Sequence, residues 1–160
     1  MKIRQLTADD YVKAAALLRQ AFPRSRYEAQ LVEKLQENKK IVHDWVCIHR
    51  HSVIAYIAFS KAFDGIKVCG LHLAPLAVQP QMQNQGIGSE LLRFSLRQEG
   101  IKESAIFVFG EPKFYQKFGF QRCAQPVCPF DKNNAHFLSI RDTPTHEYSV
   151  GYEREFKTCG

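Results

Sequence analysis

Residues 76–89 read LAVQPQMQNQGIGS, and this stretch decides the fold. An apolar run that ends at Val78 is typical of a buried strand, and the polar run after it leads into a helix that begins near Gly86. The first amides of a helix have no partner within it, and the helix dipole attracts anions such as phosphate to that end. Gly86 and Gly88 let an anion approach the backbone closely. The segment therefore predicts a phosphate-binding loop between a strand and a helix.

The glycine spacing excludes two common phosphate-binding loops. A dinucleotide fingerprint, Gly-x-Gly-x-x-Gly, would need a third glycine where the chain has Leu91. A Walker loop needs a lysine directly after a glycine, and neither Gly86 nor Gly88 has one. The remaining pattern is Gln-x-x-Gly-x-Gly, which begins at Gln83. Taken alone, it also fits a helix start with small residues for close packing.

A second motif lies about 30 residues further on, where residues 115–120 read YQKFGF after a short apolar run at 105–109. Together the two motifs resemble the GNAT superfamily of N-acetyltransferases. The acyl-CoA loop of that family, Gln/Arg-x-x-Gly-x-Gly/Ala, follows a bulged strand, and its second signature is Tyr-x-x-x-Gly-Phe. The Gly-Glu-Pro turn at 110–112 and the run GYEREF at 151–156 look most like the YhbS-type branch. The resemblance is strongest from Leu73 to Phe120 and thinnest between Cys123 and Tyr148.

The resemblance implies an α/β fold, a single GNAT domain over residues 1–160. Such a domain has a mixed, twisted sheet with helices on both faces and splayed central strands. Pro75 interrupts the apolar run before the glycine loop, and proline cannot donate to a strand ladder. We therefore expect a bulge at Pro75, beside the point where the central strands separate.

The periodicity of apolar residues predicts the remaining elements. Apolar positions at helical spacing indicate helices, and β-branched and aromatic runs indicate strands, with a hairpin at residues 49–52. The expected helices cover 11–22, 27–37, 86–99 and 113–118, and the expected strands cover 2–6, 45–49, 53–59, 68–78, 105–109, 137–140 and 150–156.

The resemblance also implies acetyl-CoA as the acyl donor, with no metal. The main chain of Leu76 and Val78 would pair with the pantetheine arm, and residues 83–89 would surround the pyrophosphate. The candidate cofactor-binding residues are Leu76, Ala77, Val78, Gln83, Asn84, Gln85, Gly86, Ile87, Gly88, Ser89 and Tyr115.

Two side chains are candidates for catalysis. Tyr115 would donate a proton or hydrogen bond to the departing thiolate, although a tyrosine beside two phenylalanines can also be a packing residue. Glu28 would accept the proton of the amine, although a glutamate at a helix start can simply favour the helix dipole. His72 and a water chain are the alternative bases. A backbone amide near Val78 would hold the oxyanion, by analogy with the family.

Composition narrows the class of protein. The 160 residues, 45% hydrophobic and 24% charged, suit one globular domain. No apolar run approaches the roughly 20 residues of a membrane span, and no signal peptide is evident, so we expect a cytoplasmic protein. Five cysteines form no Cys-x-x-Cys pair, which favours reduced thiols over a metal site.

The formal net charge of +6 indicates affinity for anions without naming one. Nucleic acid is not expected, because the basic residues form no stripe with interleaved aromatic residues. Five basic residues could assist the CoA phosphates or an acidic acceptor: Arg24, Arg26, Lys113, Lys117 and Arg122. Basic residues outnumber acidic ones nine to five in residues 1–40, where the fold borders the acceptor, and we hypothesise an acceptor that is not strongly cationic.

The function that the sequence predicts is transfer of an acetyl group from acetyl-CoA to a primary amine of a small molecule or peptide, directly within a ternary complex. The alternative is a non-catalytic acyl-CoA-binding sensor or partner subunit with the same fold. The expected partners are acetyl-CoA and the amine, with no membrane, and homodimer formation is left open.

Overall fold

A computed structural model describes residues 1–131 and 133–159. The main sheet has the strand order β1-β2-β3-β4-β5-β8-β6, and β9 pairs with the far end of β3 and with β7. The strands are β1 (Lys2–Gln5), β2 (Val42–His49), β3 (Ser52–Asp64), β4 (Lys67–Val78), β5 (Ile106–Phe109), β6 (Gln121–Arg122), β7 (Pro126–Val127), β8 (Phe137–Ile140) and β9 (Tyr148–Gly151). The helices are α1 (Tyr11–Ala21), α2 (Tyr27–Glu37), α3 (Ile87–Ser95), α4 (Pro112–Gln116) and α5 (Glu155–Thr158), with the 3₁₀ turns η1 (Ala8–Asp10) and η2 (Pro80–Met82).

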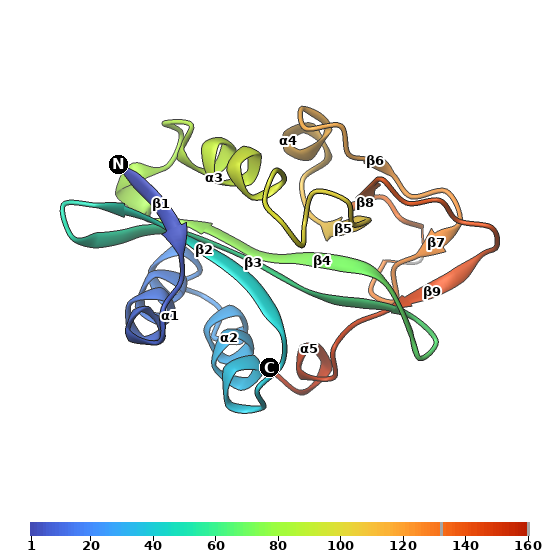
Figure 1. The fold of residues 1–160 in the computed structure, drawn as a ribbon, viewed down its shortest axis with the longest axis horizontal. Helices are drawn as coiled ribbons and strands as arrows, with labels where there is room; N and C mark the ends of the chain where they lie inside the picture. The colour runs from blue at the N-terminus through green and yellow to red at the C-terminus, as the bar shows by residue number, and fades with distance from the viewer. Residues whose placement is uncertain (132, 160) are drawn as a thin grey trace.

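Helices cover both faces of the sheet, as Figure 1 shows: α1, α2 and α5 lie on one side, and α3 and α4 on the other. Leu18 of α1 and Val32 of α2 pack against Tyr56 in one core. Leu91 of α3 packs with Trp45 and Phe59 in the other. The apolar stripes that predict these helices are therefore the helix faces that pack against the sheet. The α/β architecture with helices on both faces is confirmed.

The bulge expected at Pro75 is present in the ladder between β3 and β4. The register pairs Ile57 with Leu76 and Phe59 with Leu73, so Ala74 and Pro75 together oppose the single residue Ala58. Proline lacks the N–H that a ladder position would use, and the bulge places it where pairing is already interrupted.

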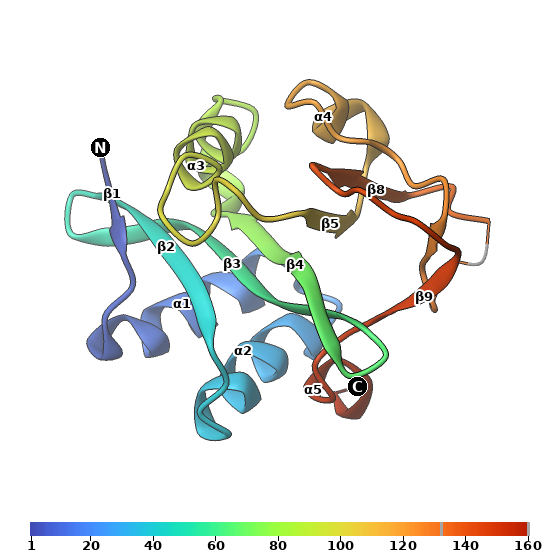
Figure 2. The ribbon, with the colours of Figure 1, turned by 45° about the vertical axis from the view of Figure 1, so that its right-hand side comes forward.

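The central strands separate just after they meet. β4 and β5 are parallel and pair only at Leu71 with Ile106 and at His72 with Phe107. Beyond these pairs the strands diverge, and the end of β4 runs under α3 (Figure 2). The splayed arrangement expected from the resemblance is confirmed, and it leaves one edge of β4 without a neighbouring strand.

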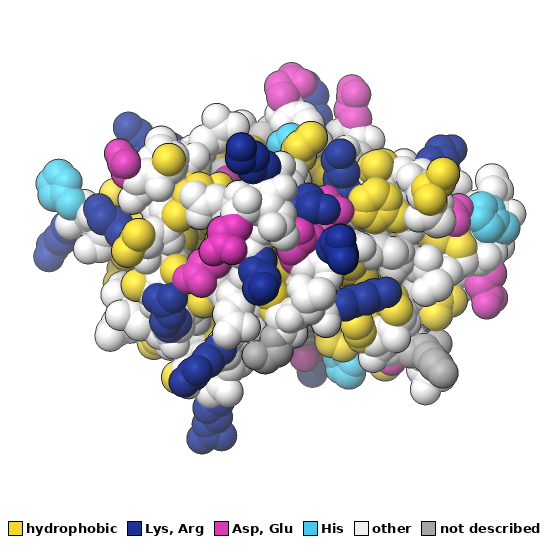
Figure 3. Space-filling view, turned by 90° about the horizontal axis from the view of Figure 1, so that it is seen from below, with side chains coloured by type: hydrophobic (Ala, Val, Ile, Leu, Met, Phe, Trp, Pro, Cys, Tyr) yellow, Lys and Arg dark blue, Asp and Glu magenta, His cyan; other side chains and the backbone are white. Residues whose placement is uncertain are grey.

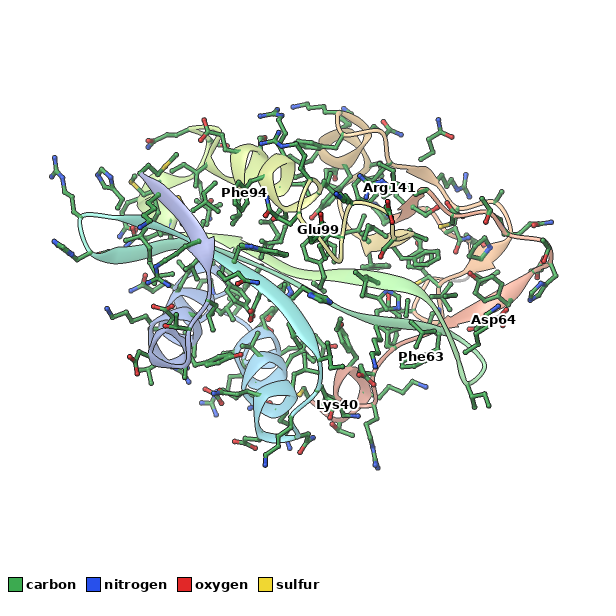
Figure 4. All side chains as sticks on the ribbon, in the orientation of Figure 1. Lys40, Phe63, Asp64, Phe94, Glu99 and Arg141 are labelled. Atoms are coloured by element: carbon green, nitrogen blue, oxygen red, sulfur yellow. The ribbon has the colours of Figure 1, made fainter. Side chains whose placement is uncertain are left out.

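The strand predicted over 150–156 is wrong beyond Gly151. β9 ends there, and residues 155–158 form α5, which packs against α2. Tyr27 on α2 donates a hydrogen bond to the carbonyl oxygen of Phe156 at 2.7 Å, and Lys40 reaches Glu153 and Glu155 at 3.5 and 3.8 Å (Figure 4). These tertiary contacts stabilise a helix whose local pattern alternates like a strand.

Helix α3 is shorter than the predicted 86–99 and ends at Ser95. The guanidinium of Arg141 donates to the carbonyl oxygens of Leu96 and Ile101, at 3.2 and 3.0 Å (Figure 4). Because a distant arginine satisfies these carbonyls, the chain can leave the helix early and turn towards β5.

The helices and the surface charges are the features that bear on membrane or nucleic-acid binding. No helix within 1–131 or 133–159 is long and apolar enough to cross a membrane. On the face formed by α1, α2 and α5, Lys and Arg side chains are spread among acidic and polar ones rather than gathered in one stripe (Figure 3).

Candidate active site

The glycine loop forms the start of α3. Gly86 is the N-cap with φ +83°, a left-handed conformation that glycine adopts without steric cost, and Asn84 in the loop also has a positive φ of 63°. The first helical hydrogen bond runs from the Glu90 amide to the Gly86 carbonyl. The amides of residues 87–89 therefore precede the first helical bond and are free to bind an anion.

Glutamine side chains brace this loop from within. The amide nitrogen Nε2 of Gln83 donates to the Val78 carbonyl oxygen at 3.0 Å, and that of Gln85 donates to the Gln81 carbonyl oxygen at 3.3 Å. Gln83 thus ties the loop to the end of β4. Its carboxamide holds the loop in shape, and the free donors of the loop are backbone amides.

The open edge of β4 presents backbone groups next to the loop. The Gln79 amide donates to Ile54 of β3 at 2.8 Å. Hydrogen bonding alternates along an antiparallel ladder, so Ala77 also faces β3, whereas Leu76 and Val78 face away from it. The bond from Gln83 to the Val78 carbonyl agrees with this alternation. The amide and carbonyl of Leu76 and the amide of Val78 therefore point towards the gap between β4 and β5.

A cleft of about 560 Å³ joins the loop to this edge. A Cβ placed on Gly86 would meet nothing within 4 Å, and one on Gly88 would meet only Val78 Cγ2 at 3.4 Å. Lys117 contributes a cation to the wall. Among the predicted cofactor-binding residues, the cleft is lined by Leu76, Ala77, Val78, Gln83, Asn84, Gly86, Ile87, Gly88 and Ser89, whereas Gln85 and Tyr115 do not line it.

A second cavity of about 550 Å³ adjoins the first, and Phe22 and Leu76 line both. Tyr115, Glu28 and His72 all line the second cavity, so the structure brings the three titratable candidates to one place. The cleft extends to the glycine loop, and the second cavity extends to Tyr115, Glu28 and His72. The open end of β4 lies between them.

Tyr115 is held by its neighbours on α4. Its side chain is 8% exposed, and its ring contacts the rings of Phe114 and Phe120 at centroid distances of 4.9 and 5.7 Å. Burial raises the pKa of Tyr115 to about 12. A thiol has an ordinary pKa of about 8.5, so Tyr115 keeps its proton and suits hydrogen-bond donation to a thiolate better than full proton transfer.

Glu28 is fixed at the start of α2. Its Oε2 accepts a hydrogen bond from the hydroxyl of Ser25 at 2.9 Å, and Ser25 Oγ accepts from the Tyr27 amide at 3.1 Å. The carboxylate is half-buried and lines the second cavity. It is therefore positioned to meet an ammonium or an amine proton there.

His72, the alternative base, is buried in the wall of the second cavity. It is 1% exposed, its ring stacks on Tyr152 at 3.6 Å, and Nε2 donates to the Gly151 carbonyl at 3.0 Å. Burial lowers the pKa of His72 to about 3, so the ring stays neutral. Its Nδ1 is buried without a hydrogen-bond partner within the described chain. The histidine therefore supports the cavity wall.

Sequence reasoning missed several cavity residues. Phe22, Phe130, Tyr152 and Phe156 line the second cavity, yet they come from three distant segments. The one available signal was the spacing of Tyr152 and Phe156, which are four positions apart and share one face if that segment is helical. In the described part of the chain, no three His, Cys, Asp or Glu side chains form a group that could hold a metal ion.

Comparison with known proteins identifies the family. The sequence profile of the acetyltransferase (GNAT) domain matches residues 40–122 of this chain, which include the glycine loop and the Tyr-x-x-x-Gly-Phe motif. The chain belongs to the GNAT acetyltransferase family. In this GNAT chain the matched range contains the bulge at Pro75, the paired part of β4 and β5, and the loop before α3.

Solved structures agree with the assignment to the GNAT family. The GNAT N-acetyltransferase YhbS from Escherichia coli, in complex with CoA, is 28% identical with a TM-score of 0.89, over 99% of this chain and 93% of YhbS. A GNAT acetyltransferase from Brucella melitensis, in complex with acetyl-CoA, is 26% identical with a TM-score of 0.81, over 97% of each chain. The GNAT fold is therefore shared along almost the whole chain.

A curated relative matches a shorter part. YjhQ, an uncharacterized N-acetyltransferase of Escherichia coli K12, is 34% identical over 105 residues, which are 61% of this chain and 57% of YjhQ. The chain thus matches somewhat more than half of the length of that relative.

Proposed function

We propose that this protein transfers an acetyl group from acetyl-CoA to a primary amine in a ternary complex. The observation that carries the proposal is the junction of two cavities at the open end of β4, one reaching the free amides of α3 and the other reaching Tyr115 and Glu28. The complexes of YhbS with CoA and of the Brucella melitensis protein with acetyl-CoA support this use of the fold.

Backbone donors hold the donor substrate in this proposal. The amides of residues 87–89 bind the pyrophosphate at the positive end of α3, where Lys117 adds a charge. The outward-facing groups of Leu76 pair with the amides of the pantetheine arm, as an added strand would. The amide of Val78 faces the same gap and is the donor for the oxyanion that develops on the thioester carbonyl.

Two side chains take part in the proposed proton transfer and thiolate stabilisation. The amine nitrogen forms a bond to the carbonyl carbon as the carbon–sulfur bond breaks, and the sulfur leaves with the electron pair. Glu28 accepts the proton that the amine loses, and Tyr115 donates a hydrogen bond to the departing thiolate. The products are the acetylated amine and CoA, which acquires its thiol proton from solvent when it does not remain a thiolate.

The test is release of free thiol from acetyl-CoA by the purified protein, with and without a panel of primary amines, beside calorimetric binding of acetyl-CoA. The expected result is saturable, amine-dependent thiol release. Binding of acetyl-CoA without thiol release for any amine would instead support the alternative function, a non-catalytic acyl-CoA-binding sensor or partner subunit.

A further inference from the structure

Aromatic side chains from several elements line the second cavity, beside aliphatic ones such as Leu31 and Val108. Tyr27 comes from α2, Phe109 from the end of β5, and Phe130 from the segment after β7. Tyr152 precedes α5, and Phe156 lies within it. These five rings line the cavity that, in the proposed reaction, receives the acceptor.

The aromatic rings of this wall support one another. Tyr152 lies 3.6 Å from His72, 4.9 Å from Phe156 and 5.1 Å from Phe130, measured between ring centroids. Stacked and tilted rings at these distances attract each other and resist rearrangement. The wall is therefore a preformed apolar surface.

Charge in the second cavity is confined to one carboxylate. Glu28 is the single Asp or Glu among the described residues that line it. The acidic residues of the neighbouring C-terminal segment, Glu153 and Glu155, face Lys40 instead and do not line the cavity. His72 is 1% exposed, and burial lowers its pKa to about 3, so it adds no positive charge. The cavity can form an ion pair with one ammonium group, and further cationic groups would be desolvated there without a second carboxylate.

We infer that the acceptor is a primary amine carried on an aromatic or branched aliphatic group, with a single cationic centre. This inference rests on the proposed acetyl transfer. Glu28 receives the amino group, and the aromatic wall receives the apolar body. A cavity of about 550 Å³ is the size of a small-molecule site. Polyamines and aminoglycosides, which carry several charges, are disfavoured.

The mouth of the cavity supports the same conclusion. Phe109 and Phe130 are 51% and 53% exposed, although large aromatic side chains usually avoid water. Both line the cavity, so an apolar group that enters would cover them. Burial of the acceptor between these rings would stabilise its complex in proportion to its apolar area.

The test compares amines with apolar and with polycationic bodies in the thiol-release assay. Propylamine, butylamine, hexylamine and 2-phenylethylamine form the apolar arm, and spermine and kanamycin form the cationic arm. We expect kcat/KM to rise roughly threefold to fourfold for each buried methylene group, and 2-phenylethylamine to exceed spermine by at least tenfold.

Variants of the cavity mouth sharpen the test. Phe130→Ser and, independently, Phe109→Ser should lower kcat/KM for 2-phenylethylamine about tenfold, with propylamine affected less than twofold. Ile66→Ser is the matched control, because Ile66 is fully exposed at the turn between β3 and β4 and lines neither cavity. Ile66→Ser should leave kcat/KM unchanged for both 2-phenylethylamine and propylamine.

The outcomes separate this inference from the proposed function. Faster acetylation of spermine or kanamycin than of 2-phenylethylamine would overturn the inference and leave acetyl transfer intact. Equal rates along the alkylamine series would also overturn it. Absence of thiol release in both arms, with acetyl-CoA bound, would overturn the proposed function as well.

Discussion

Cε2 of Tyr115 lies 2.6 Å from the position that a Cβ on Gly110 would occupy. That distance is well inside van der Waals contact, so position 110 has no room for any side chain while the ring keeps its place. The glycine directly after β5 thereby sets the position of the tyrosine on α4. Gly110 is a positioning residue, since it acts through Tyr115.

Gly110→Ala should therefore displace the ring and lower kcat about tenfold, with the affinity for acetyl-CoA unchanged. Tyr115→Phe should lower kcat about 10- to 100-fold, because a hydrogen bond to a charged sulfur contributes about 1.5 to 3 kcal/mol. A double-mutant cycle checks that Gly110 acts through Tyr115. In the Tyr115→Phe background, Gly110→Ala should lower kcat only slightly further.

The pH dependence provides a control for the Tyr115 prediction. With a pKa of about 12, Tyr115 keeps its hydroxyl proton throughout the usual assay range. The ratio of kcat between wild type and Tyr115→Phe should be constant from pH 6 to pH 9. A ratio that falls towards one by pH 9 would contradict the proposed state of this residue.

Gly86→Glu should abolish acetyl-CoA binding, with at least a 100-fold rise in Kd. The new carboxylate would stand in the open space beside the free amides of α3 and repel the pyrophosphate. Gly65→Glu is a matched control, because Gly65 also has a positive φ and open space around it. Both variants should lose similar stability, about 1 kcal/mol. Calorimetry should detect the binding loss in Gly86→Glu alone.

Lys40→Met should loosen α5 and the part of the second cavity wall that Phe156 of α5 forms. Glu155 is 1% exposed, accepts a hydrogen bond from Asn38 at 2.7 Å, and has Lys40 at 3.8 Å as its nearby cation. Loss of that cation should lower the free energy of unfolding by about 1 to 3 kcal/mol. KM for the acceptor should rise severalfold, while Kd for acetyl-CoA stays constant.

Lys13→Met is the control for Lys40→Met, because Lys13 is exposed on α1 and forms no ion pair with any residue in 1–131 or 133–159. It should leave both stability and KM unchanged. Equal effects of the two substitutions would show that net charge, and not the docking of α5, is responsible.

Asp44→Asn should change how stability depends on pH. Asp44 is buried and accepts a hydrogen bond from the hydroxyl of Tyr56 at 2.9 Å, and burial raises its pKa to about 6. An unfolded aspartate titrates near 3.9, so the folded state binds the extra proton between these values. The stabilisation that Asp44 contributes is therefore present below pH 4 and lost as pH rises through 6.

Denaturant unfolding of wild type and Asp44→Asn at a series of pH values measures this effect. Because Oδ1 of asparagine can still accept from Tyr56, the difference between the two proteins isolates the titration. The stability of wild type relative to Asp44→Asn should fall by about 2 kcal/mol from pH 4 to pH 7. A difference independent of pH would show that Asp44 titrates normally.

Local chemistry explains which features were predictable. Proline lacks an amide hydrogen, so Pro75 marks the bulge in β4 wherever that strand lies in the sheet. The free amides at the start of α3 were predictable in the same way, because a strand, a glycine and a helix follow one another in the sequence. Features of this kind depend on residues that are adjacent along the chain, so they can be predicted from the sequence.

The C-terminal segment was predictable only in part. Its alternating pattern favours a strand, and β9 is indeed a strand as far as Gly151. The next residues turn into α5 because Tyr27, Asn38 and Lys40 provide partners from another part of the chain. No local pattern contains those partners.

The sequence by itself thus determined the glycine loop, the bulge and the family, since each depends on residues close together along the chain. Tertiary structure decided the second cavity. Phe22, Phe130 and Phe156 lie far apart in the sequence and meet only because the sheet and α5 bring them together. Side-chain contact of this kind depends on distance in space, and periodicity along the chain does not encode it.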